Sequence, residues 1–182
     1  AWEEEKDYEV VDELPFWFNG RGFINKKRNR IYLYNAKKKK LQALTEPLFD
    51  VGGVKFCSKC GKVAYTGHTF NARRAQSSAL YLYDVETGET SCLVEDGTYS
   101  IGNFCFDNAH GEIVFSANPI KDGYPAPGNN LYAVSLKGGK VEAVYEGIPE
   151  ELGCTTGCDV RYGGGNSMKA VDGVLYLVTS YD

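Results

Sequence analysis

The chain has 182 residues and a formal charge of −4, from 20 Lys and Arg against 24 Asp and Glu; 43% of its residues are apolar and 24% are charged. This composition excludes wholesale disorder. The net negative charge argues against a nucleic-acid partner, because a nucleic-acid-binding surface must neutralise phosphates. Apolar runs such as 174–178 are far shorter than the roughly 18 residues of a membrane helix, so no membrane partner is expected. No secretory signal is visible either, and a cytoplasmic location is predicted.

One pattern of strand, tight turn and strand repeats along the chain at a spacing of about 50 residues. Residues 54–67 align with 104–117, and residues 79–95 align with both 30–46 and 130–146. Glycines fall at the same turn positions, where a positive φ costs them nothing. The predicted units are 9–46 (without its first strand), 52–96, 102–147 and 167–182 (its first two strands only).

Four-stranded units of this length are typical of β-propeller blades, which bury their faces against one another. The predicted fold is therefore all-β, a partial propeller of four-stranded antiparallel blades with about two full blades and two partial ones. Because two full and two partial blades do not close a ring, the chain is expected to be a fragment of a longer protein. Alternatively, several copies complete one another as a homo-oligomer through exposed blade edges.

The cysteines offer a candidate metal site. Cys57 and Cys60 form a C-x-x-C-G-K pattern, and Cys154 and Cys158 form a second pair. Four thiolates can hold tetrahedral zinc. However, Cys57 and Cys60 align with Asp107 and His110 in the next unit, where no thiol is present, and this favours ordinary thiols in turns. No cofactor is expected.

Other motifs are weaker. The nucleophile pattern G-x-S-x-G is absent, so no catalytic residue is expected in this chain. His110 and His68 are interpreted as a turn residue and a strand-end residue, and the lysine run 37–40 as a solvated turn. Two loops, 68–78 and 117–129, break the repeat, and connections of this length often carry function. Arg73, Arg74 and Tyr124 in these loops are the candidates for contact with a substrate or partner.

The stretch 13–51 resembles bacterial serine peptidases of the prolyl oligopeptidase family, in the acylaminoacyl-peptidase and dipeptidyl-peptidase-like branch. The resemblance rests on the run Pro15 to Phe23 (PFWFNGRGF), on Tyr32-Leu33-Tyr34-Asn35 and on Leu44-Thr45. The family's S-x-D-G blade turn appears as Ser58-Lys59-Cys60-Gly61, with Cys60 in place of Asp.

The resemblance implies a parent protein with an N-terminal propeller and a C-terminal α/β-hydrolase domain, which would hold the Ser, Asp and His of an acyl-transfer reaction. The propeller would cap the active site and admit only short peptides, and the hydrolase domain and peptide substrates would be its partners. One alternative is a propeller that binds proteins and has no peptidase activity. Another is a different propeller enzyme, such as a lyase, that uses groups outside this chain.

Overall fold

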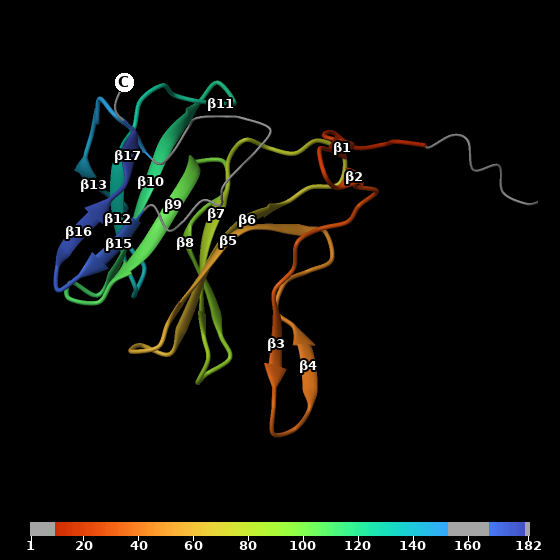
Figure 1. Cartoon of the computed structure of the whole chain (residues 1–182), viewed down its shortest axis with the longest axis horizontal. Helices are drawn as coiled ribbons and strands as arrows, with labels where there is room; N and C mark the ends of the chain where they lie inside the picture. Colours follow the sequence, from red (N-terminus) through yellow and green to blue (C-terminus); the bar gives the residue numbers. More distant parts are fainter. Residues whose placement is uncertain (1–9, 153–167, 181–182) are drawn as a thin grey trace, which may run out of the picture. The chain divides into compact units, whose positions relative to one another are not determined.

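The computed structural model describes residues 10–152 and 168–180, and all regular structure within these ranges is β-strand (Figure 1). The chain forms two compact units, 1–51 with 69–75 and 52–68 with 76–182. The predicted all-β class is therefore confirmed. The strands pair as antiparallel sheets of two to five strands, and none of these sheets is closed within the described ranges.

The first unit contains two short hairpins. Strands β1 (Trp17–Phe18) and β2 (Gly22–Phe23) pair around a turn in which Gly20 has a φ of 76°. Strands β3 (Tyr32–Asn35) and β4 (Lys40–Ala43) form the second hairpin. In its turn Lys39 has a φ of 49°, at the position that a glycine occupies in the other repeats. A side chain with a Cβ is unfavourable in this conformation.

A buried ion pair anchors the first unit. The side chains of Glu13 and Arg28 are 2% and 0% exposed, with 2.5 Å between Oε2 and Nη2. Arg28 also donates to the Phe70 carbonyl at 3.1 Å, and its guanidinium lies 3.7 Å from the centre of the Phe70 ring. The Lys26 N–H donates to Glu13 Oε1 at 2.6 Å. Burial alone raises the pKa of Glu13, but these bonds outweigh it and hold the pKa below its ordinary value.

Two larger sheets form most of the second unit. In the first, the order β5-β6-β7-β8 follows the chain. In the second, β9 pairs with β10, and β10 pairs also with β12 and with the short β11; β13 completes this sheet. The strands are β5 (Phe49–Cys57), β6 (Lys62–Thr69), β7 (Ala79–Asp84), β8 (Thr90–Val94), β9 (Tyr99–Asp107), β10 (Glu112–Lys121), β11 (Tyr124–Pro125), β12 (Leu131–Ser135) and β13 (Glu142–Tyr145).

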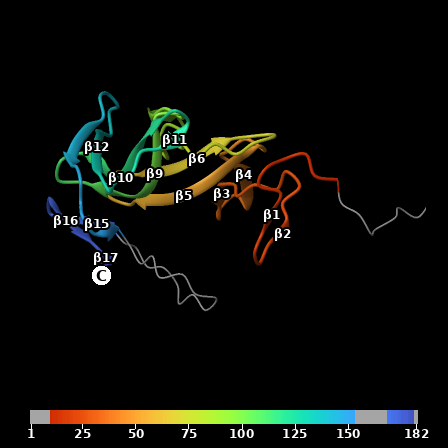
Figure 2. The ribbon, with the colours of Figure 1, turned by 90° about the horizontal axis from the view of Figure 1, so that it is seen from above.

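The chain then forms two more strand pairs. Strands β15 (Met168–Val171) and β16 (Val174–Leu177) make a hairpin within the predicted range 167–182 (Figure 2). Strand β14 (Glu151–Leu152) pairs with β17 (Thr179–Ser180). The two large sheets run from Phe49 to Val94 and from Tyr99 to Tyr145, close to the predicted ranges 52–96 and 102–147, but their assignment as propeller blades stays a prediction.

The sequence repeat has a matching backbone repeat. Gly61 and Gly111 have φ values of 63° and 69° in the β5–β6 and β9–β10 turns. Each accepts a backbone hydrogen bond at 3.0 Å through its carbonyl, from Val85 and from Leu136 respectively. Each turn is thereby fastened to the end of the third strand of its own sheet. The aligned residues therefore make equivalent contacts in the two sheets.

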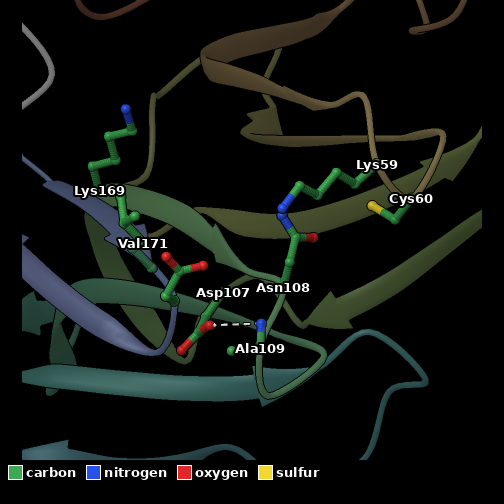
Figure 3. A pocket seen from close by; sticks show the side chains of 9 residues that line it. Lys59, Cys60, Asp107, Asn108, Ala109, Lys169 and Val171 are labelled. Atoms are coloured by element: carbon green, nitrogen blue, oxygen red, sulfur yellow. Dashed lines mark hydrogen bonds between the residues drawn. The ribbon is translucent and has the colours of Figure 1, made fainter.

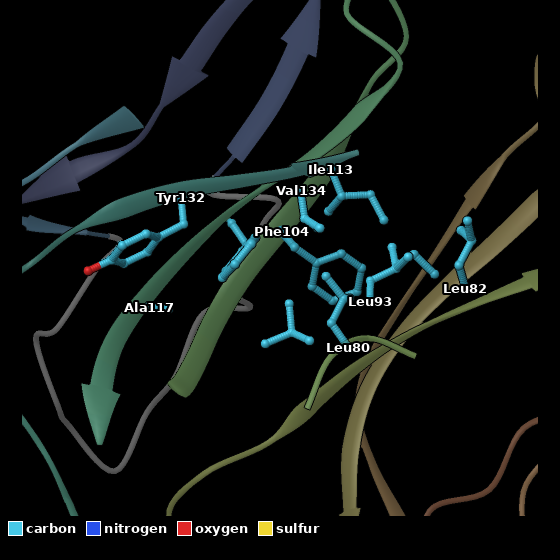
Figure 4. Close-up of a cluster of buried hydrophobic side chains, with 11 residues drawn as sticks. Leu80, Leu82, Leu93, Phe104, Ile113, Ala117, Tyr132 and Val134 are labelled. Carbon is cyan, nitrogen blue, oxygen red and sulfur yellow. The ribbon is translucent and has the colours of Figure 1, made fainter. Parts of the chain in front are cut away.

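The main core lies between the two large sheets (Figure 4). Leu80, Leu82 and Leu93 come from one sheet, and Phe104 and Phe115 from the other; all five side chains are buried. On the opposite face of the second sheet, Cys105 and Leu131 pack with Met168 of β15 in a smaller core. Because neighbouring residues in a strand face opposite ways, a sheet covered on both faces needs consecutive apolar residues.

The predicted loop 117–129 is in large part strand. Strand β10 continues through Ala117 to Lys121, and β11 turns back along it. Asp122 and Gly123 between them have φ values of 51° and 81°. Two consecutive positive φ values are typical of a type I′ turn, whose twist suits a two-residue hairpin. The Asp-Gly pair was therefore the local signal for this hairpin.

Candidate functional site

Three hairpin turns of the second unit border one pocket of about 590 Å³ (Figure 3). The β5–β6 turn contributes Lys59 and Cys60, the β9–β10 turn contributes Asp107, Asn108 and Ala109, and the β15–β16 hairpin contributes residues 169–172. These turns are equivalent members of the sequence repeat. The sequence identified each turn, and the packing of the sheets brings the three together.

Direct contacts hold neighbouring turns together. The Cys57 thiol donates to Asn108 Oδ1 at 3.1 Å and links the first turn to the second. Between the second and third turns, a Cβ added at Gly173 would lie 3.1 Å from Cε1 of His110. Gly173 also has a φ of 79°. A side chain at this position would be strained by the positive φ and would crowd the ring of His110.

The Cys60 thiol at this site is a poor nucleophile at neutral pH. The Cys60 N–H donates to Cys57 Sγ at 3.2 Å, so the two thiols lie in one turn. Burial, together with the neighbouring Cys57, raises the pKa of Cys60 to about 11. Because the thiolate is the reactive form, Cys60 stays protonated and unreactive near pH 7.

The second turn carries an ion pair. Asp107 Oδ2 lies 2.7 Å from Nδ1 of His110, and the Ala109 N–H donates to Oδ1 at 3.0 Å. Burial alone raises the pKa of Asp107, but the bonds from His110 and Ala109 outweigh it and hold the pKa low. The hydrogen bond to Asp107 raises the pKa of His110 above its ordinary value. The i, i+3 spacing of Asp and His in the sequence was the available signal for this pair.

Glu112 lies opposite Asp107 across the hairpin, and one ligand atom from each of Asp107, His110 and Glu112 falls within 4.8 Å of the others. Two carboxylates facing each other repel unless a positive charge lies between them. A protonated His110 supplies that charge, and both oxygens of Asp107 are already hydrogen-bonded. The ion pair therefore accounts for the cluster without a metal ion.

The predicted site residues fall in different places. Arg73 and Arg74 lie in the first unit. Arg73 forms an isolated parallel β-bridge with Leu14, and the Arg74 N–H donates to the Leu14 carbonyl at 2.8 Å. Tyr124 lies in the second unit, in β11, with 59% of its surface exposed. Their role in contacting a substrate or partner stays a prediction.

Only two of the four cysteines proposed as zinc ligands lie in the part of the chain that the structure describes. Cys57 and Cys60 share the first turn, whereas Cys154 and Cys158 lie outside the described residues. Within the described ranges, Cys57, Cys60, Cys92 and Cys105 are free thiols. A four-thiolate site therefore stays a prediction.

Comparison with known proteins gives no family. A scan against models of protein families finds no match, and a search of curated proteins finds no significant relative. In residues 10–152 and 168–180, no helix is long and apolar enough to cross a bilayer.

Proposed function

We propose that this chain is part of a β-propeller and that it forms the non-catalytic, access-controlling region of a serine peptidase similar to the prolyl oligopeptidase family. The stacking of the sheets is the observation that supports the propeller assignment. The second large sheet has the first sheet against one face and the β15–β16 hairpin near the other. Equivalent turns of the three meet at one pocket. Successive blades of a propeller stack in this manner around its axis.

The peptidase assignment is supported by the sequence resemblance over residues 13–51. In this proposal a C-terminal α/β-hydrolase domain supplies the nucleophile, the base and the oxyanion-binding groups. The propeller limits access to short peptides and packs against that hydrolase domain. The protein acts in the cytoplasm, and this chain carries no catalytic group of its own.

A second candidate is a propeller that binds proteins and lacks peptidase activity. It is favoured by the chemistry of the three-turn pocket, where the thiol of Cys60 is protonated and the carboxylate of Asp107 is committed to His110. Lys59 and Lys169 line the same pocket and form no ion pair among the described residues. These groups suit binding better than covalent chemistry.

A fluorophosphonate probe, which labels activated serines, separates the two candidates. The gene product that contains this chain is labelled in a cell extract, with the 182-residue chain alone as the matched control. The peptidase proposal predicts labelling of the gene product, a G-x-S-x-G motif encoded beyond the codon for Asp182, and no labelling of the chain alone. An unlabelled gene product without that motif would refute the peptidase role and leave the binding module.

A further inference from the structure

A second cavity of the same unit, about 220 Å³ in volume, has an uncharged lining rich in carboxamides. It lies beside the first residues of β9 and the middle of β10. Of the lining residues that the structure describes, none is ionisable, and those that are not polar are apolar or glycine. The polar residues that line it are Ser100, Asn103, Ser116, Asn118, Asn129 and Asn130. An uncharged polar lining selects against phosphates, carboxylates and cations, because their desolvation is not repaid by an opposite charge.

Comparison of equivalent positions in the two large sheets shows which residues around this cavity the fold requires. Gly102 and Ser116 correspond to Gly52 and Thr66 of the first sheet. A Cβ at Gly102 would lie 2.8 Å from Ser116 Oγ, and a Cβ at Gly52 would lie 3.3 Å from Thr66 Oγ1. A glycine facing a hydroxyl is therefore a structural feature shared by both sheets.

The asparagines are not shared. Asn103, Asn118, Asn129 and Asn130 stand where the first sheet has Gly53, His68, Ser78 and Ala79. The same strand arrangement forms in the first sheet with none of these four carboxamides. Their gathering around one cavity is therefore not a requirement of the fold, and this points to a ligand.

Two of the asparagines are oriented by bonds that leave one group of each available. Asn118 accepts from Asn130 Nδ2 at 3.2 Å through Oδ1, and Asn129 donates to the Glu150 carbonyl at 2.9 Å through Nδ2. Asn130 is itself held by the Gly147 N–H at 2.9 Å. Among the described residues, no hydrogen bond uses Nδ2 of Asn118 or Oδ1 of Asn129. The cavity thus offers one fixed donor and one fixed acceptor.

We infer that this cavity binds an amide group of a peptide. An amide carries a carbonyl acceptor for Asn118 Nδ2 and an N–H donor for Asn129 Oδ1, both in fixed positions. Asn103 and Ser100 line the same cavity, make no side-chain hydrogen bond among the described residues, and can supply further contacts. Sugar hydroxyls can serve as donor or acceptor and do not need such a fixed pair. The inference concerns only this chain and holds with or without a hydrolase partner.

The test is an NMR titration of the ¹⁵N-labelled chain with N-methylacetamide, a neutral mimic of the peptide backbone. We expect saturable shifts of the side-chain NH₂ signals of Asn118 and Asn103. A parallel titration with acetamide mimics an Asn or Gln side chain, and the tighter of the two probes identifies the source of the amide. Saturable binding of either probe at this cavity supports the inference.

The decisive variant is Asn118→Asp. It keeps the Oδ1 acceptor for Asn130, replaces the free donor by a carboxylate oxygen and adds one negative charge, so we expect affinity to fall at least about tenfold. Asn35→Asp is the matched control outside both pockets: it adds the same charge, its Oδ1 can still accept from the Lys38 N–H at 2.9 Å, and it should bind like the parent chain. Thermal unfolding of both variants reports whether they fold.

Three outcomes would overturn the inference. The first is the absence of saturable shifts at Asn103 and Asn118. The second is an equal affinity in a folded Asn118→Asp variant. The third is stronger binding of acetate or glycerol than of either amide at the same residues. None of these outcomes depends on whether the gene product reacts with a serine probe, so the two proposals can fail separately.

Discussion

Replacing Glu13 by Gln should destabilise the first unit by about 3 kcal/mol. The Glu13 carboxylate is 2% exposed and lies against the fully buried Arg28. Glutamine keeps the shape and one acceptor, but it leaves the guanidinium without a countercharge. Removing one partner from a buried ion pair typically costs about 3–5 kcal/mol. We choose the lower end because the remaining carbonyl can still accept from the Lys26 N–H.

Urea unfolding of the full chain gives the change in the free energy of unfolding, and hydrogen exchange at the Lys26 amide reports the same change locally. Glu46→Gln is the control, because Glu46 is exposed in the same unit. Its effect should stay within about 0.5 kcal/mol. If Glu13→Gln costs less than about 1 kcal/mol, the buried pair does not anchor this unit.

The same pair predicts a pH dependence. The pKa of Glu13 in the folded chain lies below 4.5, its ordinary value. The stabilisation by ionised Glu13 is therefore present above pH 4.5 and is lost as the pH falls through the lower, folded pKa. Glu13→Gln should lack this acid-dependent loss. An identical loss in the variant would show that other carboxylates cause it.

Three further predictions concern the core, a turn and the His110 pair. Phe115→Ala removes a fully buried ring from the core between the large sheets and should cost about 3–5 kcal/mol in urea unfolding; a cost below 1 kcal/mol would contradict this packing. Lys39→Gly relieves a positive φ and should raise the free energy of unfolding by about 0.5 kcal/mol, whereas Gly88→Lys at the equivalent turn should lower it. His110→Gln should lower the melting temperature most between pH 4 and 6.5. The folded pKa of His110 is raised above 6.5, so its stabilising charge is full below pH 6.5 and is lost as the pH rises through that pKa; the lowered pKa of Asp107 sets the acid limit. An NMR titration of His110 with a midpoint at or below 6.5 would refute the last prediction.

Local sequence was sufficient to predict the strands and many of the turns. Alternating and consecutive apolar residues are short-range patterns, and a glycine or an Asp-Gly pair at a turn reflects the φ of that residue alone. This is why Gly61, Gly111 and the all-β class were predicted. The same reasoning missed the β10–β11 hairpin, because the repeat indicated a loop there and the Asp122-Gly123 signal was not weighed against it.

The two candidate sites needed the tertiary structure. Lys59, Asp107 and Asp172 belong to turns about 50 residues or more apart, and only the stacking of the sheets brings them to one pocket. Likewise, Asn118 and Asn129 become a fixed donor and acceptor only through bonds to Asn130 and to the Glu150 carbonyl. The amino-acid sequence alone determined the repeat, the turn chemistry and the strand class, because these depend on neighbours along the chain. The tertiary structure decided which turns meet and which polar groups stay available, because both depend on contacts between distant residues.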